Sequence, residues 1–132
     1  MCRSNELYFK IETEQDVCRF IENTNGLHDG YIISVQYEHR GHVKGNPHWI
    51  NPALSELRIQ ILVTSIKNTI VELVFTDLVK WQLMDNGFDI VNTAISFDQS
   101  GYVMWADDDA PDVEERKKGS YVIAGNMRWR IE

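Results

Sequence analysis

Apolar and polar residues alternate along most of this chain with a period of two. Such a period places successive side chains on opposite faces of an extended strand. Six or seven segments show it, and their short connections favour antiparallel pairing. The residues predicted to face the core from the longer segments are Tyr31, Ile33, Val35, Tyr37, Leu57, Ile59, Ile61, Val63, Val71, Leu73, Phe75, Val79, Trp81, Leu83, Val91, Ile95, Phe97, Tyr121, Ile123, Met127, Trp129 and Ile131.

Turn signals separate these segments. Lys67-Asn68 is predicted to join two of them as a tight hairpin. The segment from Thr69 to Leu83 is long for one strand, so we expect a bend or bulge near Asp77. Asp85-Asn86-Gly87 and Asp98-Gln99-Ser100-Gly101 are further turn signals.

One helix is predicted near the N-terminus, over Glu14 to Asn23. Thr13 is suited to cap it, and Asn25-Gly26 is suited to end it. Its apolar face is predicted to consist of Val17, Phe20 and Ile21. With 132 residues and no internal repeat or linker, we expect a single domain over residues 1–132. The predicted fold class is α+β: an antiparallel sheet of six to seven strands, with the helix packed on it or at its end.

Charge narrows the classes of partner. The formal net charge of −7 disfavours a nucleic-acid binder, because such proteins need a basic surface to replace phosphate counterions. It is compatible with a basic protein partner. Cys2 and Cys18 imply no disulfide framework, and no signal peptide or membrane-spanning run is evident. We therefore expect a cytoplasmic protein without a membrane segment or cofactor, as a monomer or small homo-oligomer.

His28 and Asp29 stand together between the helix and the first long strand. Such a pair can ligate a metal or act as an acid–base couple. Adjacent residues on an extended chain point to opposite sides, however, and no third partner is marked. The favoured interpretation is a structural turn, in which Asp29 accepts backbone N–H bonds and His28 caps or packs beneath it.

Three histidines, His39, His42 and His48, lie in a loop that also contains Pro47 and Pro52. Neutral imidazole is a common zinc ligand. Their spacing matches no closed zinc pattern, so we predict no metal site here.

An acidic stretch follows Ala106 and is expected to form a solvated loop. It consists of Asp107, Asp108, Asp109, Asp112, Glu114 and Glu115. The spacing and central glycine of a calcium-binding loop are missing. Its functional alternative is contact with a basic surface, where charges at the rim of an interface steer association.

No nucleophile or phosphate-binding signature occurs in the sequence, which favours binding over catalysis. The candidate contacts with a protein partner are the acidic-loop residues Asp107, Asp108, Asp109 and Asp112, the outward strand residues Glu38, Arg58 and Gln60, and Trp49 as an exposed aromatic anchor.

Two segments resemble small bacterial immunity proteins of polymorphic toxin systems. These are LHDGYIISV (Leu27 to Val35) and IVELVFTDLVKWQL (Ile70 to Leu83), with FDIVNTAISFD after the second. The resemblance covers Leu27 to Asp98, and the histidine loop is longer than that pattern implies. It implies a non-catalytic protein that binds and neutralises a partner toxin, or a related domain of unknown role.

Two hypotheses from different classes follow. The first is a non-catalytic protein-binding module, with an immunity-like role as its most concrete form. The alternative is a small metal-dependent hydrolase or ligand-binding domain that uses His28 and Asp29 with one of His39, His42 or His48.

Overall fold

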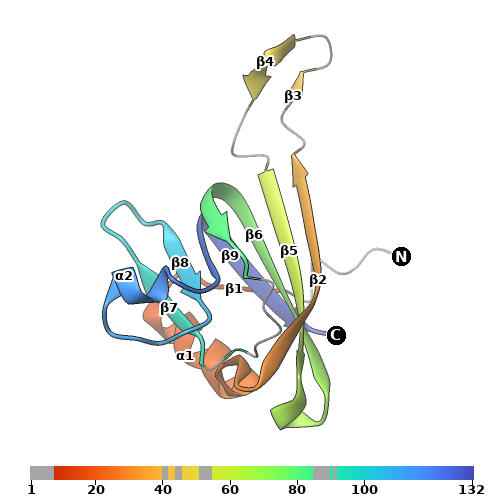
Figure 1. The fold of residues 1–132 in the computed structure, drawn as a ribbon, viewed down its shortest axis with the longest axis vertical. Helices are drawn as coiled ribbons and strands as arrows, with labels where there is room; N and C mark the ends of the chain where they lie inside the picture. Colours follow the sequence, from red (N-terminus) through yellow and green to blue (C-terminus); the bar gives the residue numbers. More distant parts are fainter. Residues whose placement is uncertain (1–7, 40–41, 44–45, 51–54, 85–89, 91) are drawn as a thin grey trace.

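The computed structural model describes residues 8–39, 42–43, 46–50, 55–84, 90 and 92–132. These residues form a seven-stranded antiparallel sheet with one main helix, so the α+β prediction is confirmed (Figure 1). The elements in chain order are β1 (Phe9–Lys10), α1 (Glu14–Thr24), η2 (Asn25–Leu27), β2 (Gly30–His39), β3 (His42–Val43), β4 (Asn46–Ile50), β5 (Ser55–Val63), η4 (Thr64–Ile66), β6 (Thr69–Gln82), β7 (Ala94–Phe97), β8 (Val103–Ala106), α2 (Val113–Arg116) and β9 (Tyr121–Ile131).

The strand order of the sheet is β2-β5-β6-β9-β8-β7, and β1 pairs with β9. β3 and β4 form a separate two-stranded ladder beyond the ends of β2 and β5 (Figure 1). An isolated bridge joins Gly30, at the start of the edge strand β2, to Ile90. Two backbone hydrogen bonds, Asp29 N–H to Ile90 O at 3.0 Å and Ile90 N–H to Gly30 O at 2.7 Å, hold this bridge. The sheet is curled, and α1 lies against its inner face (Figure 1).

Helix α1 begins where the sequence predicts. The Thr13 side chain accepts a hydrogen bond from the Asp16 N–H, and the Asp16 side chain accepts one from the Thr13 N–H, which completes a capping box. Val17 and Phe20 are buried, and the Phe20 ring packs edge-on against Trp129 with centroids 5.3 Å apart. Ile21 is 39% exposed, so its predicted place in the core is wrong.

Strand β5 follows the predicted alternation, whereas β6 is buried at five consecutive positions from Val71 to Phe75. Every second residue of β5 is fully buried, and the first half of β6 faces the same core. The fully buried set is Leu57, Ile59, Ile61, Val63, Val71, Leu73 and Phe75. Trp105 and Trp129 are also buried, as expected for tryptophans at inward positions.

The predicted core assignment fails along β2 and beyond the bend of β6. Tyr31, Ile33, Val35, Tyr37, Val79 and Trp81 were expected inside but are 37–54% exposed. In β2 the register shifts between Ile32 and Ser34, so the alternation changes phase at a bulge. β2 is also an edge strand, where less of the chain packs against the inner face than at the centre of the sheet.

The burial pattern of the closing strand β9 also differs from the prediction. Val122 and Ala124 are buried in the core, whereas Ile123 is only partly buried and Ile131 is 45% exposed. The Gly125–Asn126 step changes the phase of burial, so that Met127 and Trp129 again face inward. Leu83, Ile95 and Phe97 are partly buried against the core, and Val91 lies outside the described residues.

Most predicted turns are present. Lys67 and Asn68 have φ values of 57° and 55°, but the β5–β6 connection spans residues 64–68 and includes η4, so it is longer than the predicted tight turn. Asp77 has a φ of 57° at the expected bend. The Asp98–Gly101 turn is closed by the Asp98 carboxylate, which accepts the N–H groups of Ser100 and Tyr102. The acidic stretch contains the four-residue helix α2, which the sequence did not predict, and Asp85–Gly87 lies outside the described residues.

The bend at Asp77 requires a glycine on the neighbouring strand. A Cβ at Gly125 would lie 2.4 Å from Asp77 Oδ2 and 2.9 Å from Asp77 Cβ. We therefore expect Gly125→Ala to lower the free energy of unfolding by about 1–3 kcal/mol, measured by urea denaturation.

The matched control is the same substitution in an Asp77→Gly background, where those side-chain atoms are absent. There Gly125→Ala should cost less, giving a measurable coupling between the two sites. Equal costs in both backgrounds would show that this contact does not set the bend.

Candidate binding surface on the outer face of the sheet

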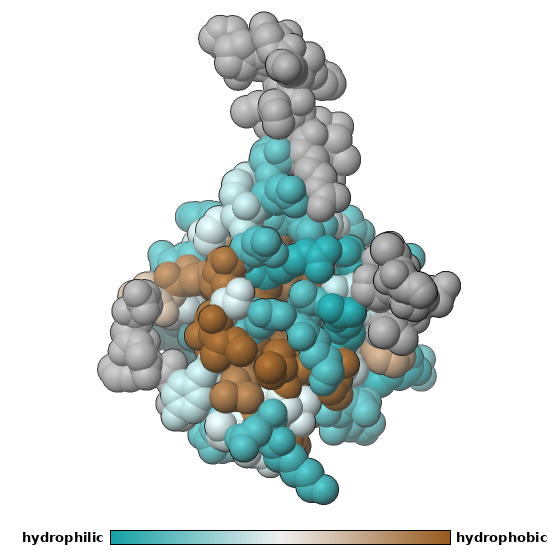
Figure 2. All heavy atoms as spheres, turned by 90° about the vertical axis from the view of Figure 1, so that its right-hand side faces the viewer, coloured by the Kyte–Doolittle hydropathy of each residue, from teal (hydrophilic) through white to brown (hydrophobic). Residues whose placement is uncertain are grey.

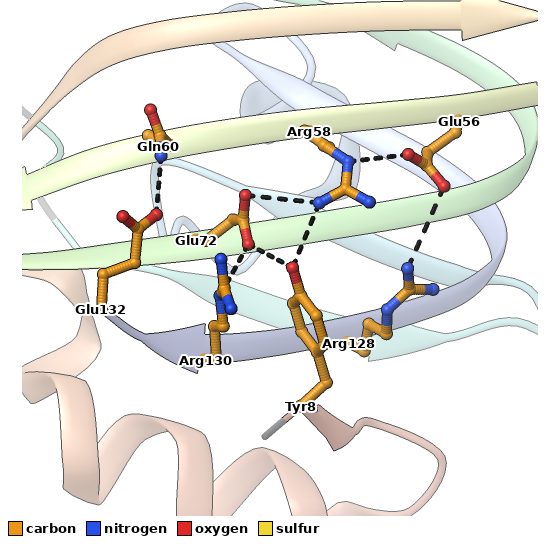
Figure 3. A network of polar contacts seen from close by, with 8 residues as sticks. All are labelled: Tyr8, Glu56, Arg58, Gln60, Glu72, Arg128, Arg130 and Glu132. Carbon is orange, nitrogen blue, oxygen red and sulfur yellow. Dashed lines mark hydrogen bonds and ion pairs between the residues drawn. The ribbon is translucent and has the colours of Figure 1, made fainter. Parts of the chain in front are cut away.

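The face of β5, β6 and β9 that points away from α1 carries charged residues at alternate positions. The register places Gln60 opposite Glu72, and Glu72 opposite Arg130. Two residues further along each strand, on the same face, Arg58 lies on β5 and Arg128 lies on β9. Together with Tyr8, just before β1, these residues form what we call the polar network: Tyr8, Glu56, Arg58, Gln60, Glu72, Arg128, Arg130 and Glu132 (Figure 3).

Glu72 lies at the centre of the polar network and its side chain is only 6% exposed. Arg130 Nε donates to Glu72 Oε1 at 2.9 Å, and Arg58 Nη1 approaches Oε2 at 3.5 Å. The Tyr8 hydroxyl also donates to Glu72 Oε1 (Figure 3). A buried carboxylate needs such partners, because an unpaired charge out of water is costly.

Tyr8 links the N-terminal segment to the three strands beneath it. Its ring lies 4.9 Å from the guanidinium carbons of both Arg128 and Arg130, a cation–π geometry. Its hydroxyl accepts a hydrogen bond from Arg58 Nη1 at 3.1 Å. Burial and the hydrogen bond to Glu72 raise the pKa of Tyr8, so its phenol stays protonated at neutral pH. Tyr8 therefore acts as a clamp that holds the N-terminal segment against these strands.

The rest of the polar network is internally paired. Arg58 Nε donates to Glu56 Oε2 at 2.7 Å, and Gln60 Nε2 donates to Glu132 Oε2 at 2.6 Å. Burial lowers the pKa of Arg58, but its hydrogen bonds to Glu56 and Tyr8 outweigh burial and raise it overall. Three guanidinium groups and the carboxylates of Glu56 and Glu72 thus hold one another in a fixed pattern, and the Gln60 amide holds Glu132. None of the eight residues of the polar network is a serine, cysteine, histidine or lysine.

Beside the polar network lies an apolar row, which we define as Tyr31, Leu62 and Ile70. The three are opposite one another across β2, β5 and β6. Tyr31 is 44% exposed, and Leu62 and Ile70 are partly exposed. Figure 2 shows apolar and polar surface side by side when the molecule is viewed from the right of Figure 1. A surface with an apolar strip and a polar surround has the anatomy of a protein interface.

The structure brings together one part of the predicted contact set. Arg58 and Gln60 belong to the polar network, and Glu38 lies on the same face because it is opposite Glu56 in the register. The side chain of Trp49, on β4, lies outside the described residues. The acidic loop lies between β8 and β9 beside α2, away from β2 and β5 (Figure 1).

The carboxylates of the acidic loop make hydrogen bonds within the loop itself. Asp108 accepts the Ala110 N–H at 3.0 Å, and Asp112 caps α2 by accepting the Glu114 N–H at 3.0 Å. Burial raises the pKa of Asp107, partly countered by a backbone hydrogen bond from Ser120. Asp109 is exposed. Three of the four predicted contacts in this loop are therefore occupied in shaping the loop itself.

The side chains of His28 and Asp29 lie closer together than two adjacent residues on an extended chain would. Asp29 has a φ of 61°, and His28 Nε2 lies 3.5 Å from Asp29 Oδ2. The carbonyls of this turn accept hydrogen bonds from Ser65 and Thr64 of the β5–β6 hairpin, which hold the turn against that hairpin.

The alternative metal site does not assemble in the described part of the chain. His39 ends β2, roughly 30 Å of extended strand from His28, and β3 and β4 lie beyond that end (Figure 1). Within the described residues, no group of three histidine, cysteine or acidic residues is arranged to hold a metal ion. The side chains of His42 and His48 lie outside the described residues.

A hollow of about 510 Å³ lies along β9 where β1 and β8 leave a gap. Its polar lining includes Lys10, Glu12, Asn126 and Arg128. No histidine, cysteine or serine is among its described lining residues.

Sequence reasoning missed most of the polar network. Tyr8, Glu56, Glu72, Arg128, Arg130 and Glu132 were not predicted as site residues. A usable signal was present, because polar residues of both signs recur at outward positions of three strands. Recognising it as one cluster required the strand order.

Comparison with protein-family models, with curated proteins and with solved structures finds no match to this chain. In the part of the chain that the structure describes, no helix has the length and apolar character needed to cross a bilayer. Function must therefore be argued from the surface itself.

Removal of the Tyr8 hydroxyl tests the clamp. We expect Tyr8→Phe to lower the free energy of unfolding by about 1–2 kcal/mol, because the buried Glu72 loses a hydrogen-bond donor. Urea denaturation measures the change. Tyr102→Phe, at a residue 36% exposed in the β7–β8 turn, should change stability by less than about 0.5 kcal/mol. Equal effects of the two substitutions would contradict the clamp.

Asp107 should weaken the fold as pH rises. Its folded-state pKa lies above the ordinary value of 3.8, so the folded state binds more protons between the two values. The free energy of unfolding therefore falls as pH rises through that window. We expect Asp107→Asn to raise the melting temperature at pH 7, with a gain that disappears below pH 3.8.

Asp109→Asn is the matched control, because Asp109 is exposed in the same loop. It should leave the melting temperature unchanged at both pH values. A gain for Asp107→Asn that does not depend on pH would contradict a cost of ionisation.

Proposed function

We propose that this chain is a non-catalytic protein-binding module that uses the outer face of its sheet. The observation that carries the proposal is the juxtaposition of an ordered polar network with an exposed apolar row (Figures 2 and 3). Among the described residues, no helix lies over this face, and Tyr8 covers part of it by stacking on Arg128 and Arg130.

Preorganisation supports binding. The charges of the polar network are already paired, so a partner does not have to immobilise flexible side chains. Glu56 and Arg58 remain partly exposed, with side chains 12% and 29% accessible. They can therefore supply oriented polar contacts at the rim, while the apolar row supplies the surface that loses water.

Charge supports a basic partner. The chain carries a formal net charge of −7, which attracts a basic protein and accelerates its encounter. The face itself has almost balanced charge, so its pattern selects a complementary surface once contact is made. Binding should weaken as the salt concentration rises.

An immunity-like role is the most concrete form of this proposal. It rests on the resemblance carried by Leu27 to Val35 and Ile70 to Leu83. Tyr31 and Ile70, two members of the apolar row, lie within these two segments. The partner would then be a toxin whose activity is blocked by occlusion, without chemistry on the part of this chain.

The test is recovery of a partner by affinity purification from the native cells, followed by measurement of affinity for that purified partner. Tyr31→Lys should weaken binding at least about tenfold, because it removes apolar contact and adds repulsion toward a basic surface. Tyr102→Lys is the matched control, since it makes the same substitution at a comparably exposed tyrosine outside this face.

The immunity role has a separate readout. Expression of the partner alone should arrest growth, and co-expression of this chain should restore growth, less effectively with Tyr31→Lys. A partner that does not affect growth would refute the toxin assignment. A partner bound equally by the two lysine variants would refute the proposed surface.

A further inference from the structure

Strand β2 forms one edge of the sheet (Figure 1). Along one side it pairs with β5 from Gly30 to His39. Along its other side, the only pairing among the described residues is the Gly30–Ile90 bridge. From Tyr31 to Tyr37, the second side of this strand therefore meets no other strand of the described chain.

Among the described residues, the bulge between Ile32 and Ser34 is the one common form of edge protection on this strand. Proteins commonly protect edge strands with lysine, proline or inward-pointing charges, because unpaired backbone groups attract other strands. The segment Tyr31 to Tyr37 contains no charged residue and no proline. Its large apolar side chains are exposed instead: Tyr31 by 44%, Ile33 by 50%, Val35 by 44% and Tyr37 by 49%.

The bulge limits which part of β2 can accept a further strand. The register with β5 shifts between Ile32 and Ser34 and is regular from Ser34 onward. Val35 and Tyr37 share the inner face, because they lie opposite Ile59 and Leu57. Ser34 and Gln36 share the outer face.

We propose that a second copy of this chain pairs with this edge, with the two β2 strands antiparallel and Gln36 opposite Gln36 of the other copy. In this register Val35 lies opposite Tyr37 of the other copy, and the contact occurs twice by symmetry. Ser34 lies opposite Glu38 of the other copy. Each pair unites side chains on the same face of the joined sheet.

The side chains of β2 favour a second copy over an unrelated strand. From Ser34 to Glu38, centring on Gln36 matches apolar with apolar and polar with polar, and no two charges of like sign face each other. Such self-complementarity is what an isologous two-fold interface requires. The exposed side chain of Tyr37 is already partly immobilised, because its ring packs on the ring of Trp81, with the two ring centroids 5.7 Å apart.

Salt distinguishes this dimer from the proposed partner complex. Two copies that each carry −7 repel each other at long range, so added salt should strengthen the dimer. Added salt should weaken binding of a basic partner. The inference goes beyond the proposed function, and the purified chain tests it without any partner.

The first experiment measures the mass of the purified chain by light scattering across a wide range of concentrations. We expect it to rise from 15.4 kDa toward twice that value. Val35→Lys should remain at 15.4 kDa at all concentrations, because it puts a charge in the apolar pairs. The matched control is Val79→Lys, at a 54% exposed position that β5 separates from the edge, and it should still dimerise. Circular dichroism checks that both variants are folded.

The second experiment fixes the register by oxidative cross-linking in a background with Cys2→Ser and Cys18→Ser. Gln36→Cys should form a disulfide-linked dimer, because residues opposite each other in antiparallel strands lie within disulfide reach. Ser34→Cys should not, because the two copies of residue 34 would lie about 14 Å apart along the strands.

Three results would overturn the inference. The first is a chain that stays at 15.4 kDa at every concentration and salt level. The second is a dimer that survives Val35→Lys, which would place the contact elsewhere. The third is equal cross-linking of the two cysteine variants, which would refute the register centred on Gln36.

Discussion

Burial of the Glu72 carboxylate is the constraint on which the outer face depends. An ionised carboxylate removed from water costs several kcal/mol unless it is paired. Its partners come from three separate segments: Arg58 on β5, Arg130 on β9 and Tyr8 before β1. A one-residue slip of either strand would turn its arginine to the other face and leave the charge uncompensated. The polar network therefore fixes strand register and the path of the N-terminal segment, beyond any stability it adds.

The same constraint explains the difference between the two charged regions of the molecule. In the acidic loop, carboxylates accept backbone N–H groups close in sequence, as Asp108 does from Ala110. On the outer face, the charged groups are held by residues distant in sequence on rigid strands. A binding surface on a rigid element keeps its geometry when the partner is absent, whereas a loop fixed only by its own turns has less to support it.

Sequence reasoning succeeded where local chemistry decides the structure. The capping box of α1, the alternation of β5 and the left-handed turn at Lys67 each depend on a few neighbouring residues. It failed along β2, because no local pattern shows that a strand lies at an edge or carries a bulge at Ile33. The polar network was beyond its reach for a similar reason: Tyr8 and Glu72 are 64 residues apart, and only the strand order brings them together. Arg58 and Gln60 were identified because their outward direction follows from alternation alone.

The bend at Asp77 changes which positions of β6 face the core. Before the bend, odd-numbered positions such as Leu73 and Phe75 are fully buried. After it, Leu78 packs against the core whereas Val79 is 54% exposed. The register with β9 then shifts between Leu78 and Lys80, so that Trp81 lies opposite the buried Val122 and Leu83 packs against the core. The pattern of substitutions that β6 tolerates should therefore shift by one position at residue 77 and shift back after residue 79. The Asp77–Gly125 pair marks the first of these two changes.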